Sequence, residues 1–203
     1  QKSTSYRNRS LFKMSASKTF QTDHMRETKI TLSSHSGTHI DAPSHFLKDG
    51  ITIDKESLNK FVGTAEVIDF TKLKKKITAS DFKAHKIKKN QIILLKTHNS
   101  FLKETDQFDS EFIYLTASGA KYLKEKKVKA VGIDYLGIEH SDSYHKTHKI
   151  LLKADIPIIE GLRLANTKAK EYYFICLPLA LECIDAAPAR AILIENFNFK
   201  KCK

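Results

Sequence analysis

A short segment in the first quarter of the chain concentrates side chains that bind metal ions. His35, His39, Asp41 and His45 fall within eleven residues. Imidazole and carboxylate groups are the usual protein ligands of zinc and manganese. A divalent cation held by such groups lowers the pKa of a bound water to about 7, which supplies hydroxide at neutral pH. The segment therefore predicts a metal site that activates water; the alternative is a polar loop whose histidines make ordinary hydrogen bonds.

The residues between these side chains favour an extended or looped path over a helix. His35 and His39 have the spacing of the two ligands in a zinc-protease helix, but Ser36 stands where those helices carry Glu. Gly37 and Pro43 are also poor helix residues. Alternate side chains of an extended segment share a face, and all four candidate ligands have odd numbers. We therefore expect them to converge, with Gly37 leaving space for an ion.

A second group of ionisable side chains lies farther along the chain. The segment 139–148 contains three further histidines, of which His148 is the last, and an apolar strand candidate follows and ends at Glu160. A buried carboxylate requires a partner or a metal ion. Glu160 could therefore complete a metal site with the first segment, or it could form a salt bridge with a lysine.

The apolar patterns along the chain predict a mixed α/β fold. Strands are expected at 27–33, 64–70, 91–96, 128–134, 156–160, 172–177 and 191–195. A helix is expected at 116–126 with Thr116 as its N-cap, and shorter helices at 54–61 and from residue 78. Because strands and helices alternate, an α/β architecture is favoured. The first residues lack such a pattern, so we expect an irregular N-terminal arm at 1–28 and a single domain at 29–203.

The composition is that of a globular protein. Its 203 residues suit one domain, with 41% apolar and 29% charged residues. No apolar run approaches the ~20 residues of a membrane-spanning helix, so no membrane partner is expected.

The segment 1–10 lacks the apolar core of a signal peptide. Cys176, Cys183 and Cys202 lack metal-type spacing, which favours reduced thiols and a cytoplasmic location.

The chain is strongly basic. Its formal net charge is +12, which raises the possibility of a nucleic-acid partner. The lysines are scattered along the sequence, however, which favours a solvated surface over a nucleic-acid site. A basic surface could also draw an anionic substrate toward a cleft.

The segment from His35 to Phe46 reads His-x-Gly-Thr-His-x-Asp-x-Pro-x-His-Phe and resembles the signature of the "putative cyclase" family. That family includes the bacterial-type, metal-dependent kynurenine formamidases and the isatin hydrolases. The similarity extends roughly from residue 29 to 194, through further segments at 131–134, 148–152, 156–160, 177–179 and 187–191. The resemblance implies a compact swivelling β/β/α-type domain with a mixed, barrel-like sheet, usually as a homodimer.

The resemblance also implies roles for individual residues. Five side chains would be metal ligands: His35, His39, Asp41, His148 and Glu160. Asp41 would bridge from a first ion to a second, and His45 would be the catalytic acid/base rather than a ligand. One or two divalent ions are implied, with zinc expected first and manganese as the alternative.

The predicted function is hydrolysis of a small amide. The expected substrate is N-formylkynurenine, which would yield kynurenine and formate in tryptophan catabolism. His45 would take a proton from water and deliver it to the leaving nitrogen. A cyclic amide or lactone hydrolase of the same family is one alternative, and a non-enzymatic metal- or nucleic-acid-binding protein is another. The chain has no Trp, so its substrate-binding residues remain unassigned.

Overall fold

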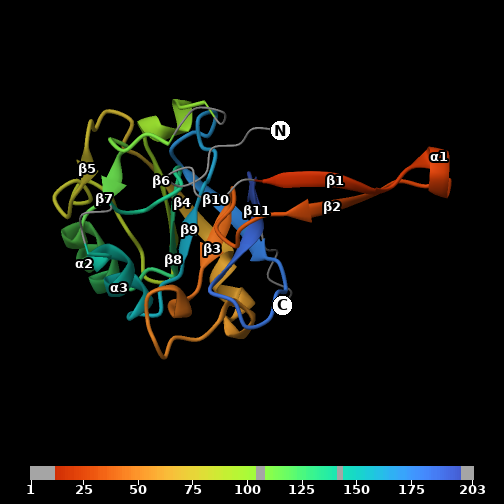
Figure 1. Ribbon diagram of the computed structural model, residues 1–203. Helices are drawn as coiled ribbons and strands as arrows, with labels where there is room; N and C mark the ends of the chain where they lie inside the picture. Colours follow the sequence, from red (N-terminus) through yellow and green to blue (C-terminus); the bar gives the residue numbers. More distant parts are fainter. Residues whose placement is uncertain (1–11, 104–107, 141–143, 198–203) are drawn as a thin grey trace, which may run out of the picture.

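Seven strands close into a barrel at the centre of the molecule (Figure 1). Around the barrel they follow the order β10 (Glu171–Pro178), β11 (Ala186–Ile194), β3 (His39–Asp41), β9 (Ile158–Glu160), β8 (Ala130–Ile133), β6 (Ile92–Lys96) and β4 (Val62–Asp69). The pairs β4–β6, β6–β8 and β8–β9 are parallel. The remaining pairs of the barrel are antiparallel. This closed, mixed sheet confirms the predicted α/β class and barrel-like architecture.

The computed structural model describes residues 12–103, 108–140 and 144–197. The segment 1–10 and Cys202 lie outside the described residues, as do residues 141–143 of the second histidine segment. Within the described part of the chain, no helix combines the length and the apolar character needed to cross a membrane.

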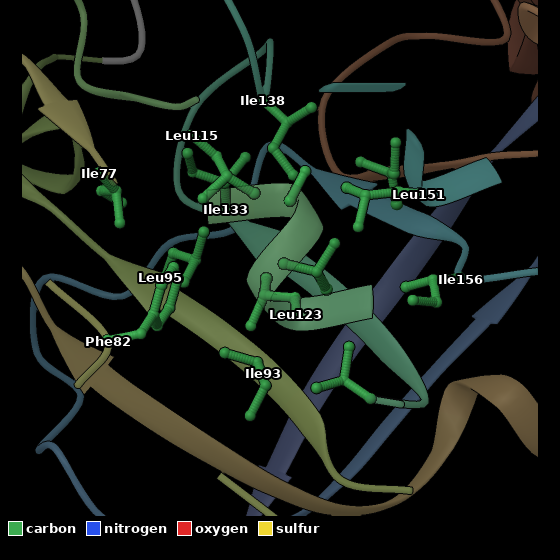
Figure 2. Close-up of a cluster of buried hydrophobic side chains, with 14 of the residues drawn as sticks. Ile77, Phe82, Ile93, Leu95, Leu115, Leu123, Ile133, Ile138, Leu151 and Ile156 are labelled. Atoms are coloured by element: carbon green, nitrogen blue, oxygen red, sulfur yellow. The ribbon is translucent and has the colours of Figure 1, made fainter. Parts of the chain in front are cut away.

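The barrel separates two apolar cores. On the central strand β6, Ile92 and Leu94 point into the barrel, whereas Ile93 and Leu95 pack outside it. All five residues of β6 are buried, which explains its unbroken apolar run, since parallel strands are covered on both faces. Figure 2 shows the outer core, where Ile93 and Leu95 lie with Leu123 and other apolar side chains.

Two helices cover the outer core. They are α2 (Ala117–Glu125) and α3 (Lys146–Leu152), which contribute Leu123 and Leu151 to it. Thr116 caps α2, as predicted, because its hydroxyl accepts a hydrogen bond from the Gly119 amide at 3.3 Å. The short strands β5 (Lys76–Ile77) and β7 (Tyr114–Leu115) form a separate parallel pair.

Two expected short helices are absent from their segments. The segment 54–61 instead forms two 3₁₀ turns, at Ile53–Lys55 and Leu58–Phe61, because Glu56 and Ser57 adopt extended backbone conformations between them. At residue 78, the Thr78 amide donates to the Asp81 carboxylate at 2.7 Å, as a helix cap would. The chain then continues in turns without forming a helix.

The N-terminal arm is a β-hairpin that projects from the barrel (Figure 1). It consists of β1 (Lys13–Lys18), the short helix α1 (Phe20–Asp23) and β2 (Glu27–Thr31). The prediction of an irregular arm is therefore wrong for these residues, and the strand expected at 27–33 is confirmed with a shorter C-terminal end. The sequence does not predict β1, because all of its residues but the last are exposed and neither face carries the alternating apolar pattern that reveals a half-buried strand.

Candidate metal centre

Two paired strands place a histidine and two carboxylates together on the barrel wall. In the antiparallel pair β3–β9, His39 lies opposite Glu160, and Asp41 lies two residues along the same face. The intervening Ile40 and the neighbouring Ile159 point into the barrel core, so His39, Asp41 and Glu160 point outward. All three are at most 4% exposed. Strand alternation therefore builds a buried polar cluster at the outer surface of the barrel.

The polar atoms of this cluster surround two small spaces. His39 Nε2 lies 3.4 Å from Asp41 Oδ1 and 3.4 Å from Glu160 Oε2. His148 Nε2, from α3, lies 3.5 Å from Asp41 Oδ2 and 3.4 Å from Glu160 Oε1. The two oxygens of each carboxylate thus face different histidines. Ligands at ~2.0–2.1 Å from a tetrahedral cation stand roughly 3.4 Å apart, so these separations fit shared cations.

Three buried atoms of this cluster lack hydrogen-bond partners. They are His39 Nε2 and both carboxylate oxygens of Asp41. A buried polar atom left without a partner is costly, and native structures rarely tolerate several in one place. Coordination of a cation would satisfy all three. The donor set of imidazole nitrogens and carboxylate oxygens therefore fits a divalent metal ion.

His35 and His45 reach the cluster from turns on either side of β3. His35 lies in a turn, and its Nδ1 is 3.0 Å from Asp41 Oδ1, an ion-pair separation without the alignment of a hydrogen bond. His45 ends the 3₁₀ turn Pro43–His45, and its ring lies 4.1 Å from that of His35. The expected extended or looped path is therefore confirmed, with His39 and Asp41 on a strand and with His35 and His45 in turns. The four side chains converge because turns bring the outer two back to the strand.

Asp185 joins the two outer histidines. It immediately precedes β11, whose pairing with β3 sets Ala186 opposite Asp41. Its Oδ2 lies 2.9 Å from His35 Nε2 and 3.2 Å from His45 Nδ1. One carboxylate therefore fixes the orientation of both rings, which leaves His35 Nδ1 facing Asp41 and leaves His45 Nε2 free of Asp185.

Backbone groups orient the buried His39. Its Nδ1 donates to the Gly37 carbonyl at 2.9 Å, which directs Nε2 toward the two carboxylates. Gly37 adopts a φ of +62°, and a Cβ placed on it would meet nothing within 4 Å. Glycine adopts this left-handed conformation readily, and the expectation that Gly37 leaves space for an ion stays a prediction. Gly161 packs against it, since a Cβ there would lie 2.2 Å from the Gly37 oxygen.

Glu139 orients His148 from the opposite side. Its carboxylate accepts a hydrogen bond from His148 Nδ1 and another from the Thr147 amide at 2.8 Å. Glu139 is 3% exposed. Its carboxylate contacts the first turn of α3, where a negative charge is favourable. A carboxylate that holds the second nitrogen of a histidine is the usual support of a metal-binding imidazole.

The electrostatics of the cluster favour added positive charge. Burial alone would lower the pKa of His39, but its contacts with Asp41 and Glu160 raise it to about 10. Burial and Asp41 would raise the pKa of Glu160, but His148 and His39 lower it to about 2. The two carboxylates therefore stay ionised and require cations beside them, which protonated histidines or a divalent metal can supply. Burial lowers the pKa of His45, which keeps its imidazole neutral.

All six side chains named from the sequence thus lie in one region. The contacts among them are formed by His35, His39, Asp41, His45, His148 and Glu160. Sequence reasoning missed Asp185 and Glu139. Glu139 lies in the second histidine segment and could have been proposed there. Asp185 is 150 positions from His35, and no local pattern marks it.

The fold and the cluster together define an α/β barrel domain with a candidate metal centre on its outer wall. A family model described as "Putative cyclase" matches residues 6–140. Cyclase-like protein 3 of Arabidopsis thaliana is 37% identical over 180 residues, which cover 83% of this chain and 65% of that protein. The chain belongs to the "putative cyclase" family, which confirms the resemblance seen in its sequence, and it spans about two thirds of the length of that relative.

Further relatives carry names that state an activity. The kynurenine formamidase of Bacillus cereus is 32% identical over 166 residues, covering 81% of this chain and 78% of that enzyme. A structure described as a "predicted metal-dependent hydrolase from Bacillus stearothermophilus" is 38% identical, with a TM-score of 0.83, and covers 94% of this chain and 91% of its own. An isatin hydrolase bound to thioisatinate is 21% identical with a TM-score of 0.80 over 90% and 80% of the two chains, so it shares the fold.

Proposed function

We propose that this protein is a metal-dependent hydrolase of a small amide, with N-formylkynurenine as substrate and kynurenine and formate as products. The observation that carries the proposal is the buried cluster around Asp41, whose two oxygens face different histidines and lack hydrogen-bond partners. A purely structural cluster gains nothing from unpaired buried atoms. A hydrolytic metal centre requires them.

We assign the metal ligands as two sets that share the Asp41 carboxylate. His35, His39 and Asp41 would hold one ion, and Asp41, His148 and Glu160 would hold a second. Zinc suits these ligands and manganese is the alternative. A divalent cation held here would supply activated water and polarise the substrate carbonyl.

His45 is the proposed acid/base. Its Nδ1 contacts Asp185, so the tautomer with the proton on Nδ1 leaves Nε2 able to accept a proton. Its side chain is 25% exposed, whereas those of His39 and Asp41 are 1% exposed. A reactant arriving from solvent can therefore reach His45, which would take a proton and return it to the leaving nitrogen.

The choice of substrate is supported by a named relative. The kynurenine formamidase of Bacillus cereus covers most of this chain at 32% identity. The names of the cyclase-like relatives carry no substrate. A cyclic amide opened as in an isatin hydrolase is the second candidate, for which the shared fold is the support.

The test compares both substrates with one variant. Wild-type protein is assayed with N-formylkynurenine and with isatin, and we expect hydrolysis of the formamide to be favoured. His45→Ala should abolish turnover while its bound metal stays near the wild-type amount, and His98→Ala, which changes an exposed histidine in a 3₁₀ turn, serves as the control. Full activity in His45→Ala would refute the acid/base assignment. Turnover of neither substrate by metal-loaded protein would refute the amide-hydrolase proposal and favour a binding protein.

We also propose that two copies form a homodimer through the projecting hairpin. Met14 and Ile30 are register partners on β1 and β2 and are 52% and 53% exposed. An isolated two-stranded hairpin is marginally stable in water, so a partner surface would stabilise it. Exposed apolar side chains on the body, at Leu177 and Ile192 of β10 and β11, offer a matching surface on a second copy. Cys176 and Cys183 are free thiols, which supports a cytoplasmic location as a further proposal.

A further inference from the structure

A hollow of about 520 Å³ lies beside the metal centre, between the loop that follows the 3₁₀ turn Pro43–His45 and the helix α3. Seven residues line it: Phe46, Leu47, Lys48, Asp49, Gly50, Lys149 and Lys153. It therefore has an apolar wall and a basic rim. Neither the ligand set nor the acid/base assignment uses any of these residues.

Phe46 is the wall that the hollow shares with the metal centre. Its ring lies 4.0 Å from the His45 ring and 4.5 Å from the His148 ring. The opening of the site at His45 and the hollow therefore lie on neighbouring sides of one aromatic side chain. A planar substrate at His45 would carry its distal substituent past Phe46.

The charge of the hollow is unbalanced. It contains three lysines and one aspartate, and within the described part of the chain no carboxylate lies within ion-pair distance of Lys48, Lys149 or Lys153. Lys149 on α3 and Lys153, which follows its last residue, are four positions apart, a spacing at which like charges repel each other; Lys149 Nζ donates a hydrogen bond to the Tyr144 carbonyl at 3.4 Å. The nearby Lys60, by contrast, pairs with Glu56 and Asp155. An anion bound in the hollow would relieve the repulsion.

We propose that this hollow binds the anionic end of the substrate, a carboxylate on the far side of an aryl amide. Lys149 and Lys153 would then select carboxylate-bearing substrates over neutral ones, and Phe46 would position the ring between them and the reacting amide. The inference deepens the proposed hydrolase function and rests on it. The net charge of +12 adds a long-range attraction for the same substrates.

The test uses two formamides that differ in charge. They are 4-formamidobenzoate, which carries a carboxylate opposite the formamide, and formanilide, which is neutral. The variants are Lys149→Gln, Lys153→Gln and their combination. Lys124→Gln is the matched control, because it also removes an exposed lysine from the last turn of a helix, α2, but does not line the hollow.

We expect the double variant to lose about tenfold in kcat/KM for 4-formamidobenzoate, mainly through KM, since two partly solvated charges at a few ångströms contribute roughly this much. Formanilide should change by less than twofold in every variant, and Lys124→Gln should match wild type with both. An unchanged preference for the anion in the double variant, or an equal loss in Lys124→Gln, would overturn the inference.

A binding measurement separates this inference from the function itself. Calorimetric titration with 4-aminobenzoate should show binding to wild type and at least a fivefold weaker affinity in the double variant. If metal-loaded wild type hydrolyses neither N-formylkynurenine nor these formamides but this difference in affinity is found, the proposed hydrolase function fails and the anion site stands. If turnover is found but the affinity is the same in both proteins, the anion site fails and the hydrolase function stands.

Discussion

Replacing Glu139 with Gln should weaken metal binding at His148 by about tenfold. Glu139 is buried and accepts hydrogen bonds from His148 Nδ1 and from the Thr147 amide. Glutamine has nearly the same shape, but only its carbonyl oxygen can accept. A charge-assisted hydrogen bond contributes ~1.5–3 kcal/mol and a neutral one about half of that, so the substitution costs about 0.8–1.5 kcal/mol in ligand orientation. Since about 1.4 kcal/mol is tenfold in affinity, the dissociation constant should rise by roughly that factor.

The assay is a competition titration of zinc between the protein and a chromophoric chelator. Glu111→Gln is the control, because Glu111 is an exposed carboxylate and its loss changes the net charge equally. Thermal unfolding of both metal-free variants separates a local effect on His148 from loss of the fold. A Glu139→Gln protein that binds zinc within twofold of wild type would refute the argument that this carboxylate holds the imidazole in place.

Two further predictions concern the surroundings of the site and the hairpin. Gly161→Ala should lower the melting temperature by roughly 5–10 °C, since its Cβ would lie 2.2 Å from the Gly37 oxygen and such a clash costs ~2–3 kcal/mol. Gly37→Ala is the control, because a Cβ there meets open space at a similar φ, and it should lower the melting temperature clearly less. Equal melting temperatures for the two variants would contradict this prediction. Met14→Lys with Ile30→Lys should convert a dimer into a monomer by light scattering, because both side chains are exposed on the hairpin. Thr31→Lys, an exposed residue on the other face of β2, should leave the mass unchanged, and a monomeric wild type would refute the dimer.

The sequence predicts the inner strands of the barrel well because their burial is complete. β6 reads Ile-Ile-Leu-Leu, and both of its faces lie in apolar cores, so an apolar run can mean little else at this length. Thr116 likewise marks the start of α2 through a local hydrogen bond. In the hairpin, β2 is predicted but β1 is not, because the residues of β1 other than its last are exposed and leave no apolar period. The closure of the barrel depends on pairings between distant segments, such as β10 with β4, and no local pattern contains them.

In the candidate site, too, only the residues placed by local structure could be predicted from the sequence. His39 and Asp41 could be placed on one face by strand alternation alone, and the structure has them so. His35 and His45 reach the cluster through turns, whose geometry their spacing does not reveal. Asp185 comes from the far end of the chain and meets the site only because β11 pairs with β3. Long-range pairing, rather than residue type, therefore decides which polar groups support the ligands.

The central claim is that the cluster around Asp41 holds a divalent metal on which amide hydrolysis depends. The most direct measurement is the rate of N-formylkynurenine hydrolysis by one preparation before chelation, after chelation and dialysis, and after titration with zinc or manganese. The account predicts loss of activity on metal removal and its recovery as one to two equivalents of metal bind, with no recovery in Asp41→Asn. Undiminished activity in the metal-free protein, or full recovery in Asp41→Asn, would contradict it.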